Sequence, residues 1–218
     1  MENYEKETIA AIATALSDSG IGIVRISGEN AIYIVDSIFR SASGKKILTK
    51  VQSHMIHYGY IVDKDENIID EVMTSVMKAP KSYTMEDTVE INCHGGVLVM
   101  QKVLETVLQA GARLAEPGEF TKRAFLNGRI DLSRAEAVID VIHSQNEYAL
   151  SSSVSQLKGR LSDKIRSLRE DILYQIAFIE SALDDPEHIS LDGYPEELEE
   201  KCAYYLTHEE ERQRIAAN

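Results

Sequence analysis

Apolar side chains recur every three or four residues between positions 150 and 183, which is the spacing of one face of an α-helix. Four of them follow one another at intervals of eleven residues, namely Leu150, Leu161, Ile172 and Leu183. Eleven residues over three turns give about 3.67 residues per turn, which is typical of a nearly straight helix and not of a left-handed coiled coil. We therefore predict one straight helix over about residues 146–183, packed in a bundle and ended by Asp184-Asp185-Pro186.

The chain before Pro117 mixes strand-like and helix-like segments. The alternation and turn residues predict strands at 7–14, 21–27, 53–62, 71–78, 88–93 and 112–115, and helices at 30–40 and 97–110. Turn-forming residues 17–20 separate the first two strands, and the polar loop 63–67 joins the next two as a hairpin. Hairpins among mixed elements favour an α+β fold with a mixed sheet over a doubly wound parallel sheet. We assign residues 1–117 to this N-terminal domain.

The strand signal ends after Pro117, and the remaining sequence is typical of helices. Short helices are predicted at 119–126 and 132–143, ahead of the long helix. Tyr194-Pro195 followed by two glutamates suits the start of another helix, because proline and acidic residues favour a helix N-terminus. Residues 118–218 are therefore expected to form the first part of an all-α helical bundle domain.

Charge and cysteine content limit the possible partners and compartment. The formal net charge is −13, and residues 180–218 contribute −9 of it from twelve acidic and three basic side chains. Such a segment repels phosphate backbones, so any RNA contact is expected at local basic patches. The two cysteines show no CxxC spacing, and neither a signal peptide nor a membrane-spanning apolar stretch is present. We expect a cytoplasmic protein with no membrane contact.

Several motifs of nucleotide, metal and catalytic sites are absent. The sequence has no GxxxxGK[ST] phosphate loop, so the chain alone is not expected to hydrolyse GTP. Gly20-Ile21-Gly22 precedes a predicted strand instead of following one, which argues against a dinucleotide site. The six histidines lack metal-ligand spacings such as HExxH, and no nucleophile elbow indicates a Ser–His–Asp triad. We therefore assign no metal ligand and no catalytic residue.

Two charged residues, Arg25 and Glu90, interrupt otherwise apolar strands, each between two aliphatic neighbours. A carboxylate on a strand can accept two parallel hydrogen bonds from a planar ring with an N–C(NH2)–NH edge. Arginine is the side chain best suited to clamp a carboxylate. Both residues are therefore candidates for ligand binding, and the alternative for each is the solvated surface position that a lone charged residue on a strand usually takes.

Two turns carry further candidates. His94-Gly95-Gly96 stands where a strand passes into a helix, so it is either a tight turn or an anion site at the helix N-terminus. The segment Pro117–Val138 combines basic and acidic side chains, and the Asn127-Gly128 turn separates its two helices. It carries Lys122, Arg123, Arg129 and Arg134 beside Glu119 and Asp131. This segment is either a self-paired charged surface or part of a binding site.

Three strings together resemble the bacterial tRNA-modifying GTPase family known as MnmE or TrmE. They are GIGIVRISG at 20–28, SYTMEDTVEINCHGG at 82–96 and PGEFTKRAFLNGRIDLSRAEAVIDVI at 117–142, in the order and spacing of the family. The resemblance extends over about residues 7–192. It implies an N-terminal domain that is similar to the folate-binding domain of aminomethyltransferases, forms a homodimer and binds 5-formyl-tetrahydrofolate or a related tetrahydrofolate. The family's binding positions fall here on Arg25, Glu90 and Arg129, the last of which is often lysine.

The resemblance also implies an activity of the full-length family. With GTP, potassium and magnesium at its GTPase domain, and with a flavin-dependent partner of the MnmG (GidA) type, that family adds an aminomethyl-type group to C5 of the wobble uridine of certain tRNAs. The GTPase domain and the C-terminal cysteine motif are absent from this sequence, and residues 201–218 depart from the usual approach to the phosphate loop. Two other interpretations stay open, namely a free-standing folate-dependent one-carbon transferase and a helical scaffold without catalysis.

Overall fold

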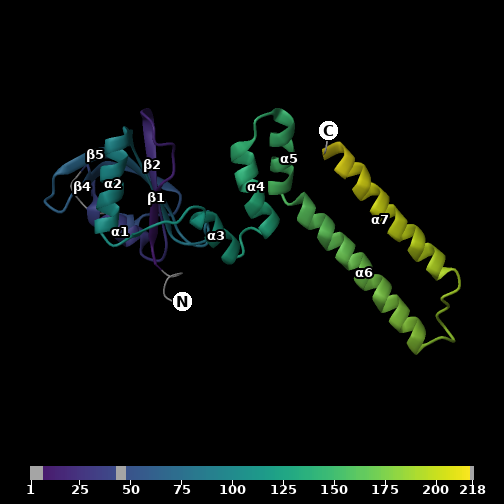
Figure 1. Cartoon of the computed structure of the whole chain (residues 1–218). Helices are drawn as coiled ribbons and strands as arrows, with labels where there is room; N and C mark the ends of the chain where they lie inside the picture. The colour runs from purple at the N-terminus through teal and green to yellow at the C-terminus, as the bar shows by residue number, and fades with distance from the viewer. Residues whose placement is uncertain (1–6, 43–47, 217–218) are drawn as a thin grey trace. The chain divides into compact units, whose positions relative to one another are not determined.

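The computed structural model describes residues 7–42 and 48–216, with side chains as far as residue 206 (Figure 1). The chain divides into two compact units with their boundary between Lys158 and Gly159. The first unit holds a sheet and helices, whereas the described part of the second unit consists of two helices and the loop that joins them. This arrangement confirms the predicted α+β fold followed by a helical segment.

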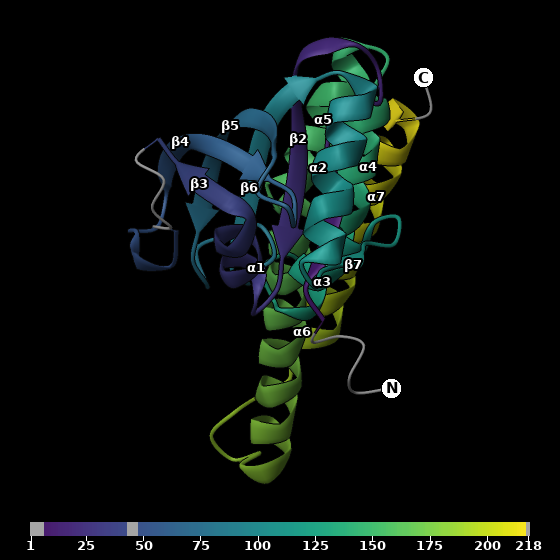
Figure 2. The same ribbon diagram turned by 90° about the vertical axis from the view of Figure 1, so that its left-hand side faces the viewer.

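The described residues of the first unit form one sheet of seven strands in the order β3-β4-β5-β6-β2-β1-β7. The strands are β1 (Ile9–Ile12), β2 (Ser19–Ser27), β3 (Phe39–Ser41), β4 (Met55–Val62), β5 (Ile68–Met77), β6 (Thr88–Gly95) and β7 (Arg113–Leu114). Strands β7 and β1 are parallel and the other neighbours are antiparallel, so the sheet is mixed, as predicted. Figure 2 shows β3, β4, β5, β6 and β2 side by side.

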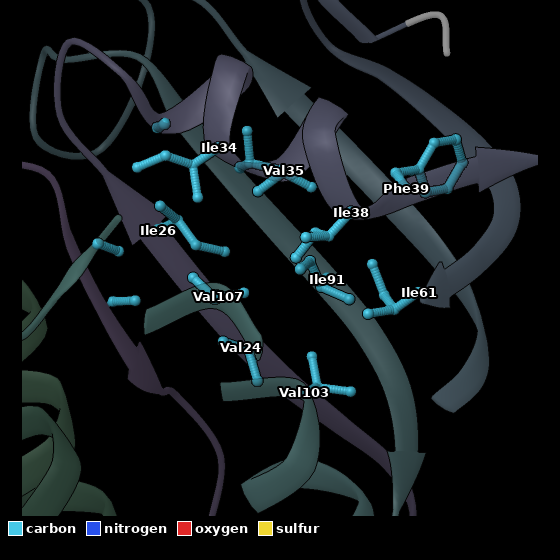
Figure 3. Close-up of a cluster of buried hydrophobic side chains, with 14 of the residues drawn as sticks. Val24, Ile26, Ile34, Val35, Ile38, Phe39, Ile61, Ile91, Val103 and Val107 are labelled. Atoms are coloured by element: carbon cyan, nitrogen blue, oxygen red, sulfur yellow. The ribbon is translucent and has the colours of Figure 1, made fainter. Parts of the chain in front are cut away.

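Helices α1 (Ala31–Ile38) and α2 (Val97–Gln109) pack on one face of this sheet. Figure 3 shows the resulting core, in which aliphatic side chains of the strands meet those of the two helices. The labelled members include Val24, Ile26 and Ile91 from strands, Ile34, Val35 and Ile38 from α1, and Val103 and Val107 from α2. Side chains alternate across a strand, so the residues between these positions lie on the opposite face, which carries the candidate site.

Strand β3 was not predicted, because the sequence pattern extends the first helix to residue 40. The helix ends at Ile38, and Phe39 adopts an extended conformation with φ −93° and ψ 138°. β3 then pairs with β4, where Gly59 faces Ser41. A Cβ atom at Gly59 would lie 2.3 Å from the Arg40 carbonyl oxygen, so this close pairing depends on glycine. Such long-range pairing leaves no periodic signal in a three-residue strand.

The other strands differ from the predicted ranges mainly at their ends. Ser19 and Gly20, predicted in a turn, belong to β2, where the register against β6 shifts between Ser19 and Gly22. The polar hairpin loop 63–67 is confirmed, because Oδ1 of Asp63 accepts hydrogen bonds from the backbone amides of Asp65 and Asn67. A short 3-10 helix, η2 (Leu48–Lys50), precedes β4.

The helices after the sheet are α3 (Glu119–Leu126), α4 (Leu132–His143), α5 (Glu147–Leu157), α6 (Arg160–Asp184) and α7 (Tyr194–Ala216). The predicted ranges of α3 and α4 and the predicted start of α7 are confirmed. The single helix predicted over 146–183 is wrong, because Gly159 has φ +86° and separates α5 from α6. The left-handed conformation ends a helix, and the apolar stripe continues across the break without revealing it.

The second unit leaves much of the apolar stripe in contact with solvent. Within this unit, Tyr194 donates a hydrogen bond to Oε1 of Gln175 at 2.5 Å and its ring packs on Phe178, so α6 and α7 are joined. Leu161, Ile172 and Leu183 are nevertheless 44%, 51% and 69% exposed. The burial predicted for a bundle core is therefore not reached by the two helices of this unit. No helix in the described part of the chain is both long and apolar enough to cross a membrane.

Candidate functional site

Arg25 of β2 and Glu90 of β6 face each other across the two antiparallel strands. Their side chains lie on the face of the sheet opposite α1 and α2, and Nε of Arg25 donates to Oε1 of Glu90 at 2.8 Å. The side chains are 30% and 23% exposed. Among the described residues, no hydrogen-bond partner is seen for Oε2 of Glu90 or for the two terminal nitrogens of Arg25. The pair thus retains one acceptor and several donors for a ligand.

Tyr83 lies close to both Arg25 and Arg129, although nothing in the sequence marks it as a site residue. The guanidinium carbons of Arg25 and Arg129 lie 5.8 and 5.0 Å from the Tyr83 ring centroid, within the range of cation–π contacts. The guanidinium of Arg25 also lies 5.6 Å from the ring centroid of Phe120 on α3. The Tyr83 hydroxyl and Thr121 Oγ1 are 3.0 Å apart and share a hydrogen bond. The structure therefore brings Arg25, Glu90 and Arg129 together around an aromatic ring.

The turn after α3 positions Arg129. Asn127 ends the helix, and Gly128 takes a left-handed conformation with φ +78°. The backbone amide of Arg129 donates to the Ala124 carbonyl oxygen at 2.9 Å, and the Asn127 side chain donates to the Thr84 carbonyl oxygen at 2.7 Å. The predicted Asn127-Gly128 turn is confirmed, and it ties Arg129 to the loop that carries Tyr83.

A buried ion-pair network fixes α3 against the sheet. Arg123, only 5% exposed, donates to both carboxylate oxygens of Glu86, to Glu119 and to the carbonyl oxygen of Glu7. Arg113 donates to both oxygens of Glu119. Burial alone would raise the pKa of Glu119, but hydrogen bonds from Arg113, from the Glu116 amide and from Arg123 outweigh it and lower the pKa to about 2. The charges of this segment therefore serve mainly to hold the helix that presents the site.

His94-Gly95-Gly96 has a structural explanation. A Cβ atom at Gly95 would lie 2.4 Å from the carbonyl oxygen of Ser19 on β2, so glycine is needed where the two strands approach. The exposed His94 ring lies with Nδ1 2.7 Å from Oδ1 of Asp70, and this hydrogen bond raises the His94 pKa. Gly96 precedes α2 without a side-chain cap. The turn explains the motif without a ligand.

Comparison with known proteins matches almost the whole chain in two parts. The family model described as the N-terminus of the GTP-binding protein TrmE matches residues 8–129, and the MnmE helical domain model matches residues 132–214. Among curated relatives, the tRNA modification GTPase MnmE of Lachnoclostridium phytofermentans is 63% identical over 88% of this chain and 42% of its own length.

Other relatives with the same name agree. The MnmE of Geobacillus kaustophilus is 54% identical over 92% of this chain and 44% of its own length, and that of Bacillus subtilis is 52% identical over 84% and 40%. The chain thus spans less than half the length of these relatives. Arg25, Glu90, Tyr83 and Arg129 all fall within the matched N-terminal region. The chain belongs to the MnmE (TrmE) family of tRNA modification GTPases.

Proposed function

We propose that this chain is the folate-binding and dimerisation part of a tRNA modification GTPase. In this proposal residues 1–117 form the tetrahydrofolate-binding and dimerisation domain, and residues 118–218 form the first part of a helical domain. The observation that carries it is the gathering of Arg25, Glu90 and Arg129 around Tyr83 on the open face of the sheet. Charged side chains converging on an aromatic ring suit a flat, polar ligand.

The ligand proposed for this site is 5-formyl-tetrahydrofolate or a related tetrahydrofolate. Its pterin ring carries an N–C(NH2)–NH edge, which donates two parallel hydrogen bonds to a carboxylate such as Glu90. Arg25 already donates to one Glu90 oxygen and thereby orients the carboxylate. The guanidinium groups of Arg25 and Arg129 are the proposed partners of the carbonyl or anionic parts of the ligand.

The whole protein would use this folate in tRNA modification. Relatives carry the name tRNA modification GTPase. For the full-length protein we propose that GTP hydrolysis with potassium and magnesium, together with an MnmG (GidA)-like flavoprotein in the cytoplasm, adds an aminomethyl-type group to the wobble uridine of tRNA. In this scheme the present chain supplies the folate and the dimer contact, with tRNA bound by the full-length protein.

An apolar patch beside the site supports the proposed homodimer. Cross-strand register places Tyr58 of β4 opposite Met73 of β5, and Met73 opposite Asn92 of β6, so all three share the face of Glu90. Ile56, Tyr58 and Met73 are 65%, 51% and 47% exposed. Contiguous exposed apolar side chains are typical of protein–protein contact surfaces. We propose this face of the sheet as the dimer interface.

Calorimetric titration of the 218-residue chain with 5-formyl-tetrahydrofolate tests the proposed function, and saturable binding is expected. Glu90→Ala removes the acceptor for the pterin edge, so its affinity should fall at least about tenfold, or about 1.4 kcal/mol. Glu90→Gln should restore binding only in part, because its NH2 group faces a donor. Glu105→Ala, which changes an exposed glutamate on α2, is the matched control and should bind like the unmodified chain. Unchanged affinity in a folded Glu90→Ala variant would leave Glu90 as an ordinary cross-strand ion-pair partner.

A further inference from the structure

A cavity of about 480 Å3 begins at Tyr83 and Arg129 and extends along α4. Aliphatic side chains of α4, among them Val138, Val141 and Ile142, form much of its wall. Its volume falls within the roughly 300–1,000 Å3 that is usual for small-molecule sites. Tyr83 and Arg129 belong both to this wall and to the proposed folate site, so the cavity adjoins that site.

The charge of this cavity is positive. Arg129 and Arg134 are its only charged lining residues in the described part of the chain. Among the described residues, Arg129 forms no ion pair with a carboxylate, and its contact is with the Tyr83 ring. An apolar wall with two cationic side chains suits an aromatic ligand that carries an anionic group.

Arg134 forms only a long ion pair with Asp131. Its Nε lies 3.6 Å from Oδ2 of Asp131, beyond hydrogen-bond distance, and this buried nitrogen has no hydrogen-bond partner among the described residues. Oδ1 of Asp131 instead accepts from the Arg134 backbone amide and from Ser133, which caps α4. By contrast, Arg123 is fully engaged by carboxylates and a carbonyl. The Arg134 side chain as a whole is 31% exposed, and among the described residues no hydrogen-bond partner is seen for its two terminal nitrogens. These nitrogens can therefore donate to a ligand carboxylate.

We propose that this cavity binds the aminobenzoyl-glutamate part of the folate and that Arg134 binds a glutamate carboxylate. The inference rests on the proposed function, because it requires the pterin ring at Glu90. The aromatic ring of the aminobenzoyl group then lies against the aliphatic wall of α4. Arg129 stands between the two parts, near the amide that joins the ring to the glutamate. Arg134 thereby makes the site selective for the acidic form of the ligand.

A titration with two ligands tests this assignment on the 218-residue chain. The first ligand is 5-formyl-tetrahydrofolate, and the second is its diamide, in which both glutamate carboxylates are neutral carboxamides. The unmodified chain should bind the acid about tenfold more tightly than the diamide, a difference of about 1.4 kcal/mol. Arg134→Gln should weaken binding of the acid to the level of the diamide and leave the diamide unchanged. Glu90→Ala should weaken both ligands by the same factor.

Arg166→Gln is the matched control, because Arg166 on α6 also pairs with an aspartate three residues before it, at 3.7 Å, but is largely exposed. It should retain the preference for the acid. Equal binding of the two ligands by the unmodified chain would overturn the role of Arg134 while leaving the folate site intact, and so would equal weakening of both by Arg134→Gln. Binding of neither ligand would overturn the proposed function and this inference together. Circular dichroism verifies that each variant is folded.

Discussion

The interaction energy of a single charged side chain in this site depends on its exposure to water. Arg25 and Glu90 are 30% and 23% exposed, so their mutual attraction is screened and contributes about 0.2–1 kcal/mol to stability. A flat ligand over Tyr83 would exclude part of that water and strengthen the hydrogen bonds to both residues. Residues that contribute little to folding can therefore contribute strongly to binding, which separates them from the buried Arg123 and Glu119.

Substitutions of Arg129 separate the effect of its positive charge from that of its planar guanidinium group. Lysine keeps the positive charge but loses the planar group that lies 5.0 Å from the Tyr83 ring centroid. Arg129→Lys should reduce affinity for 5-formyl-tetrahydrofolate by no more than about threefold, whereas Arg129→Glu should reduce it by more than about tenfold. Calorimetric titration measures both values. Similar affinities for the two variants would show that the charge of this residue does not contact the ligand.

Glu119 gives a prediction about acid stability. Its folded pKa of about 2 lies below the ordinary value of 4.5, so its contribution to stability is complete above about pH 4.5 and is lost as pH falls towards 2. The urea midpoint of the unmodified chain should therefore fall between pH 6 and pH 3. Glu119→Gln cannot lose a charge, so its midpoint should fall less over the same range. Glu105→Gln, at an exposed position, should fall as much as the unmodified chain; an equal fall in Glu119→Gln would contradict the assignment.

Arg123 gives a prediction about the same network at neutral pH. Arg123→Ala leaves the buried Glu119 carboxylate with Arg113 and the Glu116 amide as its only donors among the described residues, and it removes both hydrogen bonds from Arg123 to Glu86. Breaking a buried ion pair from one side costs roughly 3–5 kcal/mol, so the free energy of unfolding at pH 7 should fall by about that amount. Urea unfolding followed by circular dichroism measures this change. A loss below about 1 kcal/mol would indicate that water enters the network and solvates the carboxylates.

At the scale of elements, the local sequence predicts a helix or a turn where its pattern repeats over several residues. It does not predict a boundary that depends on the conformation of a single residue. Helices α3 and α4 and the hairpin loop 63–67 follow from periodicity and turn residues. The break at Gly159 did not, because the apolar spacing continues across it. For the site, the sequence marked Arg25 and Glu90 as charged residues within apolar strands, but only the register of β2 against β6 makes them partners. Tyr83 had no periodic signal, since it lies in a loop.

Gly159 gives a prediction for the helix break. An alanine in the left-handed conformation costs about 1–2 kcal/mol, so Gly159→Ala should lower the free energy of unfolding by about that amount. The matched control is Gly20→Ala, where an added Cβ atom meets nothing within 4 Å and φ is not in the left-handed region. The control should change stability by less than about 0.5 kcal/mol. If Gly159→Ala is as stable as the control, residues 158–160 can adopt the continuous helix that the apolar stripe predicts.

At the scale of the whole molecule, the N-terminal unit has two unlike faces. One face is covered by α1 and α2 and closes the core. The other carries two rows that cross the sheet in register, Ile56 with Ser75, Glu90 and Arg25, and Tyr58 with Met73 and Asn92. The apolar end of these rows lies on β4 and the charged end on β2. A second copy that covers β4 and β5 would bury apolar surface and leave the charged end for a ligand, so folate binding and dimerisation need not compete for the same residues.

Tyr58 therefore tests the proposed homodimer. Tyr58→Glu places a charge in the centre of the apolar patch, where Tyr58 is 51% exposed and lies opposite Met73. Desolvating an unpaired carboxylate in an interface costs several kcal/mol, so the dissociation constant of the dimer should rise at least about a hundredfold, or about 2.7 kcal/mol. Light scattering over a concentration series should show a dimer for the unmodified chain and a monomer for this variant. Tyr33→Glu is the matched control, because Tyr33 is 66% exposed on α1, in the layer that covers the other face of the sheet, and this variant should stay dimeric. The interface would instead lie in the helical unit if the dimer persists in Tyr58→Glu but dissociates in a variant of the exposed α6 residues Ile165 and Ile172. A monomer at every concentration of the unmodified chain would refute the dimer itself.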